Sequence, residues 1–368
     1  MTQPGSDPYA AAGVDTAAGD RAVELMKASV KATQGAEVLG GVGGFAGLFD
    51  ASALTGYRRP LLASSTDGVG TKLAIAQALD VHDTVGRDLV GMVVDDIVVV
   101  GATPLFMTDY IACGAVVPER IAAIVSGIAA GCAETGTALV GGETAEHPGV
   151  MQPDDYDIAG AAVGVVEADA VLGPEKVWHG DVVVAIASSG LHSNGFSLVR
   201  RIVDDRGLGY GDDVPEFGRP LGLELLEPTR LYAAPLLAAI EALPDGVRAL
   251  SHVTGGGMAA NLARVLPTGS WVEVDRSTWS PPAVFRVLAE WGGLDLSDAE
   301  GTWNLGVGFF AVVDGGAASS FQRELAASGM DVWVVGRVET TARDLDGFEQ
   351  GAKGVDGGAV RLVGAYAE

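Results

Sequence analysis

Cysteine is scarce in this sequence, with two residues in 368, Cys113 and Cys132, both in apolar surroundings. Two cysteines exclude a disulfide-stapled scaffold and fit a reducing compartment. Long apolar runs are also missing, since none approaches the roughly 18 residues of a membrane-spanning helix. The first ten residues, MTQPGSDPYA, have neither the basic nor the apolar stretch of a signal peptide. We therefore expect a cytoplasmic protein that makes no membrane contact.

Positively charged residues are also scarce. The chain has 23 lysine and arginine residues against 48 aspartate and glutamate residues, for a formal net charge of −25. A surface this acidic repels nucleic acids and anionic membranes, so neither is an expected partner. An anionic small molecule would bind only where free backbone N–H groups, a local cation or a bound metal overcome that field.

The chain is long enough for two domains, because 48% of its 368 residues are hydrophobic and a large core can form. Its 53 glycines, 16 prolines and alternating strand-like and helix-like runs predict a loop-rich α/β protein. The segment 174–180 is the expected junction between the two halves. We expect residues 1–18 to be a mobile tail, because they are rich in glycine, alanine, aspartate and proline.

The stretch 64–109 carries the densest group of chemically informative residues. A strand that includes 61–66 is expected to end at Asp67, which offers oxygens to a hard cation such as Mg²⁺. The glycine turn that follows precedes a helix over 72–79, whose free N–H groups would attract an anion. Thr71 is its predicted N-cap. The residues expected to bind phosphate here are Gly68, Gly70, Thr71 and Lys72.

A largely apolar helix is predicted over 83–100, yet it contains Asp88, Asp95 and Asp96. Carboxylates in such a helix are costly to bury unless they are paired or bound to a cation. Asp88 and Asp95 are seven residues apart and so lie on nearly the same face. Asp88 and Asp96, with Asp67, would suit a metal–phosphate site. The alternative is that the acids form a solvent stripe and that Lys72 is an ordinary helix lysine.

Other glycine-rich segments are candidate phosphate sites. Residues 40–47 follow no strand, so a hinge is the alternative to a loop that closes over phosphates. A short strand over 137–140 leads to two glycines and Glu143, a further candidate metal ligand. Three glycines before a predicted helix over 259–265 form a candidate cradle for a substrate phosphate, with a plain turn as the alternative. The residues concerned are Gly43, Gly44, Gly141, Gly142, Thr254, Gly255, Gly256 and Gly257.

The segment 188–195 contains His192, a candidate general base or hydrogen-bond donor. The alternative is a turn histidine that caps the next helix together with Ser193. Asn194 is the neighbouring candidate for orienting a substrate. Further on, Pro228 near its start predicts a helix over 227–242.

Several of these motifs together resemble the phosphoribosylformylglycinamidine cyclo-ligase (aminoimidazole ribonucleotide synthetase) family. They are Asp-Gly-Val-Gly-Thr-Lys at 67–72, Val-Asp-Asp-Ile at 94–97, Gly-Gly-Glu-Thr-Ala-Glu at 141–146, Ser-Gly-Leu-His-Ser-Asn-Gly at 189–195 and His-Val-Thr-Gly-Gly-Gly at 252–257. The resemblance covers roughly Tyr9 to Val338. Family members usually carry Asn where this chain has Asp95, and Phe where it has Trp303.

The resemblance implies the ATP-dependent closure of formylglycinamidine ribonucleotide to aminoimidazole ribonucleotide, with Mg²⁺, in purine biosynthesis. Lys72, His192 and Asn194 would act at the reacting end, Ser193 and Thr254–Gly257 would bind the substrate, and Asp67, Asp88, Asp96 and Glu143 would hold the metal. It also implies a homodimer in which mixed N-terminal sheets pair into a barrel, and a ferredoxin-like C-terminal α/β domain.

The expected division is a tail and glycine-rich loop (1–60), a nucleotide-binding and dimerisation domain (61–172), a substrate-binding domain (173–340) and a C-terminal extension (341–368). The alternatives are a related kinase, such as a thiamine-monophosphate kinase, and a non-catalytic nucleotide-binding partner protein. A selenophosphate synthetase is disfavoured because 40–47 contains no cysteine.

Overall fold

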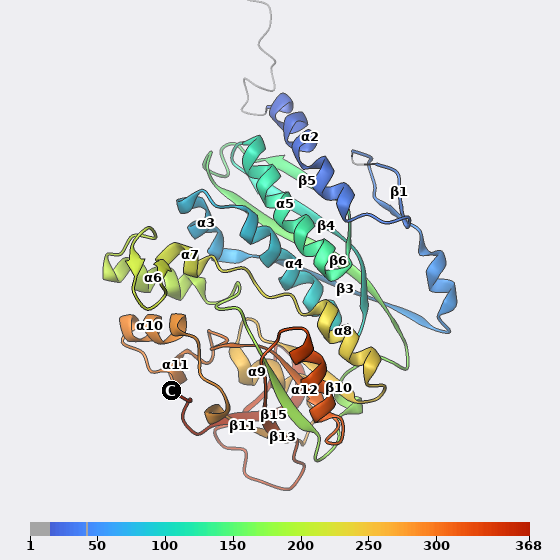
Figure 1. Cartoon of the computed structure of the whole chain (residues 1–368), viewed down its shortest axis with the longest axis vertical. Helices are drawn as coiled ribbons and strands as arrows, with labels where there is room; N and C mark the ends of the chain where they lie inside the picture. The colour runs from blue at the N-terminus through green and yellow to red at the C-terminus, as the bar shows by residue number, and fades with distance from the viewer. Residues whose placement is uncertain (1–14, 42) are drawn as a thin grey trace, which may run out of the picture.

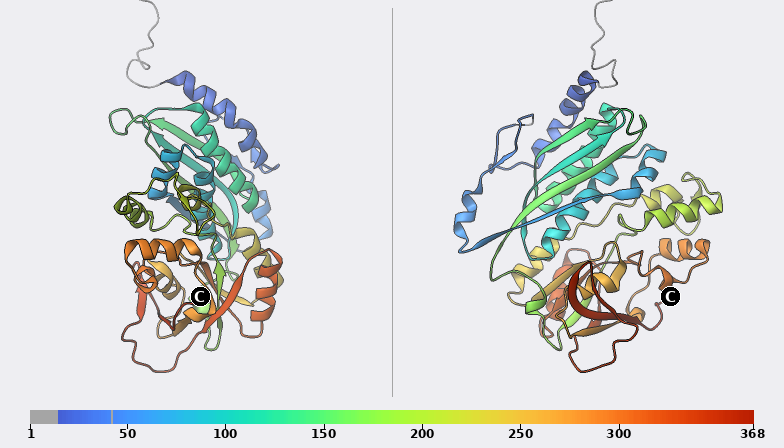
Figure 2. Two further views of the ribbon diagram at one scale, coloured as in Figure 1. Left: turned by 60° about the vertical axis from the view of Figure 1, so that its left-hand side comes forward. Right: turned by 180° about the vertical axis from the view of Figure 1, so that it is seen from behind.

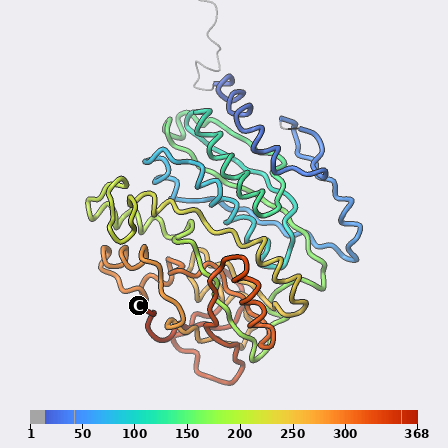
Figure 3. The backbone as a smooth tube through the Cα atoms, in the orientation of Figure 1, coloured from blue at the N-terminus to red at the C-terminus, as the bar shows by residue number. Residues whose placement is uncertain are grey.

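The computed structural model describes residues 15–41 and 43–368. The chain folds into two α/β halves that stack on one another, the N-terminal half above the C-terminal half in Figure 1. The backbone trace in Figure 3 shows the chain crossing from one half to the other in the middle of the sequence. A short 3₁₀ helix, η3 (Pro174–Lys176), lies in this connection, where the junction was predicted.

The N-terminal half is built on a mixed four-stranded sheet of order β3-β6-β4-β5. β4 and β5 run parallel, whereas β6 pairs antiparallel with both β3 and β4. The strands are β3 (Pro60–Gly68), β4 (Thr103–Cys113), β5 (Ala138–Glu146) and β6 (Tyr156–Glu167). A two-stranded hairpin of β1 (Val38–Leu39) and β2 (Leu48–Phe49), followed by η1 (Ala51–Gly56), precedes the sheet.

Helices cover one face of this sheet. α4 (Asp83–Val98) lies on the sheet, α5 (Pro118–Thr135) packs on α4, and α2 (Thr16–Ala32) packs on α5. α4 and α5 approach closely, because a Cβ placed on Gly127 would lie 1.8 Å from the Asp83 carbonyl oxygen. The opposite face is open toward the viewer in the right panel of Figure 2, and it exposes Leu62 and Tyr110.

The C-terminal half contains an antiparallel sheet of order β10-β12-β7-β13. β7 and β12 are buried along their whole length, which explains their continuous apolar sequences. The strands are β7 (Val182–Ala187), β10 (Val247–His252), β12 (Val307–Val313) and β13 (Val332–Arg337). The helices of this half are α6 (Phe196–Arg206), α7 (Leu221–Leu225), α8 (Ala233–Ala242), α9 (Gly257–Ala263), α10 (Ala283–Gly292), α11 (Leu296–Ala299) and α12 (Ala318–Ala327). Two short strands, β8 (Asp213–Val214) and β9 (Arg219–Pro220), pair with each other, and η4 (Arg276–Thr278) precedes α10.

The last part of the chain forms a small sheet with the C-terminal half. β11 (Trp271–Asp275) pairs parallel with β15 (Val355–Val363), and β15 forms a hairpin with β14 (Glu349–Ala352). The predicted extension over 341–368 therefore folds as part of this half, although the sequence suggested only a short strand within it.

Three predicted elements differ from the structure. The strand predicted to end at 140 continues to 146, because β5 pairs with β4 along its length. α3 (Leu73–Leu79) follows the 3₁₀ turn η2 (Gly70–Lys72), so Thr71 is not its N-cap. The helix predicted from 227 begins at Ala233, because backbone N–H groups of the preceding segment bind carboxylates on α4.

Two expectations from composition concern the part of the chain that the structure describes. Within residues 15–41 and 43–368, no helix is both long and apolar enough to span a bilayer. Cys113 and Cys132 are buried free thiols. The predicted mobile tail falls mostly on 1–14, outside the described residues, whereas α2 already begins at Thr16.

Candidate functional site

A cavity of about 390 Å³ lies between the two halves of the molecule. The N-terminal half contributes the carboxyl end of β3 and the last turn of α4, and the C-terminal half contributes the end of β10, α9 and the turn between β14 and β15. The polar residues that line it are Ser64, Ser65, Asp67, Asp96, Ser251, His252, Thr254, Asn261, Arg264 and Lys353. Asp67, Asp96 and Thr254, all predicted site residues, therefore share one cavity.

The acidic side of this cavity is formed by Asp67 and Asp96. The side chain of Asp67 accepts a hydrogen bond from the Gly68 N–H at 2.7 Å. Partial burial raises the pKa of Asp67, and the charge of Asp96 adds to that rise. Asp96 pairs with His252, with 2.9 Å between Oδ1 and Nδ1, and the buried imidazole of His252 stacks on Phe309. The position of Asp96 is thus fixed from the opposite half of the molecule.

This pair of carboxylates fits a magnesium ion bound to a nucleotide. Mg²⁺ is usually held by one or two carboxylates, with substrate phosphates and water completing its shell. A cation between two neighbouring carboxylates offsets the repulsion between their charges. The larger predicted set is not assembled, because among the described residues no three His, Cys, Asp or Glu side chains are grouped as metal ligands.

Lys72 and Asp88 face each other instead of the cavity. Both side chains are fully buried, with the Lys72 ammonium 2.7 Å from Asp88 Oδ2. The ammonium also donates to the carbonyl oxygens of His192 (3.0 Å) and Glu227 (2.7 Å). Burial lowers the pKa of Lys72, and the charge of Asp88 opposes that shift. In this arrangement the predicted phosphate contact of Lys72 and metal contact of Asp88 are both replaced by an internal ion pair.

Asp95 has a comparable structural contact. It is buried on α4, and its Oδ1 accepts a hydrogen bond from the Tyr232 N–H at 3.1 Å. Burial raises the pKa of Asp95 to about 7. Asp88 accepts from both the N–H and the hydroxyl of Thr229, at 2.7 and 2.6 Å. α4 therefore holds the segment 229–232 of the C-terminal half through two carboxylates.

His192 is buried in the loop after β7, in a left-handed backbone conformation (φ 60°). Its Nε2 accepts a hydrogen bond from the Ser189 N–H at 3.2 Å, so the ring is anchored to its own loop. Burial lowers the pKa of His192 well below its usual value, and the neighbouring basic groups His252, Lys72 and Arg230 lower it further. A neutral, enclosed imidazole of this kind favours the turn interpretation over a general base.

Asn194, two residues after His192, lies close to the glycine-rich segment 254–257, which we call the glycine loop. Ser193 is buried, whereas Asn194 is half-buried and contacts Met92. The Asn194 side-chain oxygen would be 3.7 Å from a Cβ placed on Gly255. Gly255 and Gly256 are exposed, and Gly256 has a φ of 102°, which side chains rarely adopt. Asn194, predicted to act at the reacting end, thus lies beside Gly255 of the predicted substrate-binding segment 254–257.

Two other predicted groups lie elsewhere. Gly43 and Gly44 are exposed in the loop of the β1–β2 hairpin. Gly141, Gly142 and Glu143 lie within β5, which is at the opposite edge of the sheet from β3. With about 4.8 Å between neighbouring strands, β5 is roughly 14 Å from β3, so Glu143 does not join Asp67 within one chain.

The cavity also contains residues that were not among the predicted site residues. His252 belongs to the His-Val-Thr-Gly-Gly-Gly motif, of which only residues 254–257 are predicted to bind the substrate. Asn261 lies on α9 and Arg264 is the C-cap residue of that helix, and their spacing of three residues places both on the side toward the cavity. Lys353 is in a glycine-rich stretch that shows no strand pattern, and no sequence signal places it here.

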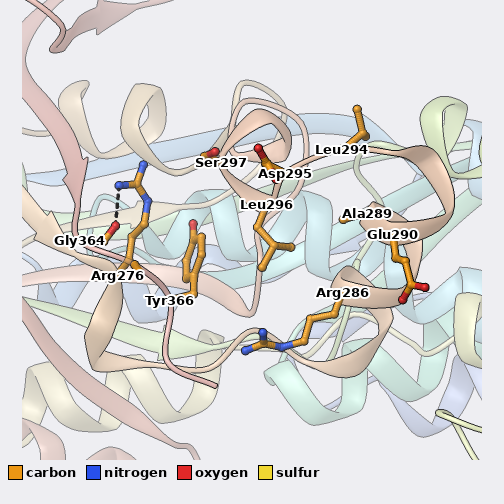
Figure 4. A pocket seen from close by; sticks show the side chains of 11 residues that line it. Arg276, Arg286, Ala289, Glu290, Leu294, Asp295, Leu296, Ser297, Gly364 and Tyr366 are labelled. Atoms are coloured by element: carbon orange, nitrogen blue, oxygen red, sulfur yellow. Dashed lines mark hydrogen bonds between the residues drawn. The ribbon is translucent and has the colours of Figure 1, made fainter.

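A larger cavity of about 660 Å³ lies in the C-terminal half, between α10, α11 and the last residues of the chain. Figure 4 shows Arg276 and Arg286 on two sides of it. Arg276 already pairs with Glu300 and donates to the Gly364 carbonyl oxygen, and Arg286 donates to the Ala367 carbonyl oxygen. These arginines fasten the C-terminal residues, and this cavity contains none of the predicted site residues.

Solved structures show that this two-part fold is shared with other proteins. The chain superimposes on thiamine-monophosphate kinase from Stenotrophomonas maltophilia with a TM-score of 0.64 and 17% identity, covering 93% of this chain and 97% of the other. It superimposes on E. coli HypE, a hydrogenase maturation protein, with a TM-score of 0.62 and 20% identity, covering 94% and 93%. Identity this low establishes the similarity of fold alone.

Sequence comparisons are more specific. Residues 50–166 match the AIR synthase related protein N-terminal domain, and residues 179–344 match the AIR synthase related protein C-terminal domain. The phosphoribosylformylglycinamidine cyclo-ligase of Thermosynechococcus vestitus is 49% identical over 341 residues, which is 92% of this chain and 98% of the relative. That of Geobacillus kaustophilus is 49% identical over 331 residues, 90% and 95% of the two chains. Over nearly its full length, therefore, the chain belongs to the phosphoribosylformylglycinamidine cyclo-ligase family.

Proposed function

We propose that this chain is an ATP-dependent cyclo-ligase that converts formylglycinamidine ribonucleotide to aminoimidazole ribonucleotide, ADP and phosphate. The observation that carries the proposal is the shared cavity, where Asp67 and Asp96 from one half face Thr254 from the other. Such a cavity suits a reaction that must hold a nucleotide triphosphate beside a sugar phosphate. The names of relatives at 49% identity agree with it.

The chemistry requires positioning more than a protein nucleophile. The amide oxygen of the substrate attacks the γ-phosphorus of ATP, and the bond from that phosphorus to the ADP oxygen breaks. The neighbouring amine nitrogen then attacks the activated carbon, a C–N bond forms, and the oxygen leaves with the phosphate. Overall the product is the substrate less one water, whose atoms leave in the phosphate.

The residues of the cavity divide these tasks. Asp67 and Asp96 hold Mg²⁺ on the nucleotide, and this ion supplies charge neutralisation for the phosphates when bound. His252 orients Asp96 through the 2.9 Å contact between them. Thr254 and the exposed N–H groups of 255–256 bind the substrate phosphate, a role supported by the glycine turn at the start of α9. Asn194 orients the reacting end from the neighbouring loop.

The quaternary proposal is a homodimer in which the open faces of two N-terminal sheets meet and close a barrel. The exposed apolar side chains Leu62 and Tyr110 on that face support it. The C-terminal domain is proposed to be ferredoxin-like, supported by the strand order β10-β12-β7-β13 and by the helices that connect β7 to β10 and β12 to β13. Two buried free thiols support a cytoplasmic location.

The test is product identification with matched variants. Wild-type protein incubated with ATP, Mg²⁺ and formylglycinamidine ribonucleotide should release ADP and free phosphate and yield a product one water lighter by mass spectrometry. Asp67→Asn and Asp96→Asn should lower kcat/KM by at least about tenfold, whereas Asp205→Asn, an exposed acid on α6, should not change it. A kinase would leave phosphate on the organic product. ADP release that does not depend on the amidine substrate would contradict the proposal.

A further inference from the structure

The turn between β14 and β15 reaches the cavity from a part of the chain that the family motifs do not cover. The match to the AIR synthase related C-terminal domain ends at residue 344, and the motifs that indicated the family end near Val338. Lys353 and Val355 nevertheless line the same cavity as Asp67 and Thr254. The wall of the site thus includes a hairpin with no previously assigned role.

This hairpin is held in a defined position. β15 pairs with β11 along five residues, from Trp271↔Ala359 to Asp275↔Val363. Its backbone also packs tightly on α9, because a Cβ placed on Gly357 would lie 2.1 Å from the Ala263 carbonyl oxygen. α9 begins at the glycine loop, so the hairpin turn and the candidate phosphate cradle rest on the same helix. Lys353 stands at the turn with a φ of 51° and an exposed side chain.

The charges around the cavity indicate that Lys353 is available to an anionic ligand. The chain has five lysines, and one of them, Lys72, is already paired with the buried Asp88. Lys353 and Arg264 are the two lysine or arginine residues among those that line the cavity, opposite the acids Asp67 and Asp96. Arg264 already donates to the Asn261 side-chain oxygen at 3.3 Å, whereas the ammonium of Lys353 is in the solvent-accessible turn.

We propose that Lys353 is a phosphate-binding residue of this site, which binds a phosphoryl group of either ATP or the phosphoribosyl substrate. The inference rests on the proposed cyclo-ligase reaction. Lysine binds phosphate as a mobile point charge, and a protein with a net charge of −25 needs such a charge wherever an anion must enter. The turn supplies it next to two carboxylates that would otherwise repel the phosphates.

The experiment compares three variants with wild type by isothermal titration calorimetry. Lys353→Asn removes the charge and keeps a residue that tolerates a positive φ. Lys353→Arg keeps the charge. Lys176→Asn, in the connection between the halves, is the matched control for losing one lysine. Each is titrated with a Mg²⁺-bound, non-hydrolysable ATP analogue and, separately, with formylglycinamidine ribonucleotide, at low and high salt.

We expect Lys353→Asn to weaken one of the two affinities by about tenfold, as the loss of one charge-assisted contact implies. Its salt dependence should also be shallower than that of wild type. Lys353→Arg should remain within about threefold of wild type, and the ligand affected identifies which phosphoryl group is bound. Unchanged affinities for both ligands, or equal losses for both that arginine does not restore, would overturn the proposal.

The outcome is separable from that of the proposed reaction. If wild-type protein yields no cyclised product while Lys353→Asn still loses affinity for one ligand, the reaction assignment fails and the role of Lys353 stands. If wild-type protein yields the product and Lys353→Asn binds both ligands as wild type does, the role of Lys353 fails and the reaction stands. Wild-type protein that binds neither ligand would overturn both.

Discussion

Asp109 offers a direct test of the electrostatics inside the N-terminal half. Its side chain is 9% exposed on β4 and lies against the neighbouring strand, where a Cβ placed on Gly142 would be 2.2 Å from Asp109 Oδ1. Burial raises the pKa of Asp109 to about 7, and a hydrogen bond from its own backbone N–H only partly offsets this. Asp109→Asn has the same shape but cannot ionise, so the variant isolates the cost of the buried charge.

The direction in which the free energy of unfolding changes with pH follows from proton uptake on folding. The carboxyl group titrates near 3.8 when unfolded and near 7 when folded, so folding binds a proton in between. The free energy of unfolding of wild type should therefore fall as the pH rises from about 4 to about 7 and then level off. At roughly 1.36 kcal/mol for each pKa unit, the full effect is about 4 kcal/mol.

Urea denaturation over that pH range measures this effect. Subtracting the wild-type free energy of unfolding from that of Asp109→Asn should cancel other titrating groups and leave a difference that grows by about 4 kcal/mol in favour of the variant. Asp205→Asn, on the exposed face of α6, should show a flat difference. A flat or falling difference for Asp109→Asn would refute the reasoning, since it would mean that Asp109 is ionised in the fold at low cost.

Further predictions concern packing and assembly. Lys72→Met leaves the buried Asp88 carboxylate without its cation and should lower the free energy of unfolding by about 3–5 kcal/mol in urea. Replacing Asp88 by an apolar residue as well should recover little of that loss, because the buried N–H and hydroxyl of Thr229 then lose their acceptor; recovery of most of it would contradict the role of Asp88 in holding Thr229. Gly127→Ala places a Cβ 1.8 Å from a carbonyl oxygen of α4 and should cost about 1–3 kcal/mol, while Gly19→Ala, with open space around it on α2, should cost nothing. If Gly127→Ala and Gly19→Ala changed the free energy of unfolding equally, the close packing of α5 on α4 would be contradicted. Leu62→Arg on the open sheet face should convert the proposed dimer to a monomer in size-exclusion chromatography with light scattering, and Leu223→Arg, exposed on the C-terminal half, should not. A dimer that survives Leu62→Arg would contradict the proposed use of that face.

Elements with local end signals could be read from the sequence. The sequence predicts a helix over 118–135 and a strand over 156–167, and both have these bounds in the structure, as α5 and β6. Proline is suited to the first turn of α5, and Gly136 ends that helix with a φ of 68°. The structure differs where distant contacts decide the conformation, as in the extended segment 227–232, whose N–H groups bind α4 instead of continuing a helix.

The same distinction applies to the site. The motifs indicated that Asp67, Asp96 and Thr254 belong together, and the structure places them in one cavity. They could not indicate which side chains would face each other in the core. Lys72 and Asp88, predicted to contact phosphate and metal, instead form a buried pair. Lys353 lies in a glycine-rich segment whose fold depends on pairing with β11, about 80 residues earlier, and such pairing leaves little trace in local sequence. The catalytic and binding roles themselves stay predictions.

The two adjacent acids of α4 show how one helix serves both structure and site. Consecutive helical residues point about 100° apart, so Asp95 and Asp96 cannot face the same way. Asp95 shares its face with Asp88, seven residues earlier, and these two carboxylates hold the N–H groups of Tyr232 and Thr229. Asp96 is turned away from that face, toward the cavity and His252.

This arrangement explains why an amide at position 95 would serve in relatives. The contact to Tyr232 needs an acceptor oxygen, which Asn and Asp both provide, and neither needs a charge there. Because the same helix turn carries Asp96, any shift of the segment 229–232 against α4 would also move Asp96 relative to His252. The buried acids of α4 therefore help to hold the two halves together, and the candidate metal ligand Asp96 is carried on the helix that they anchor.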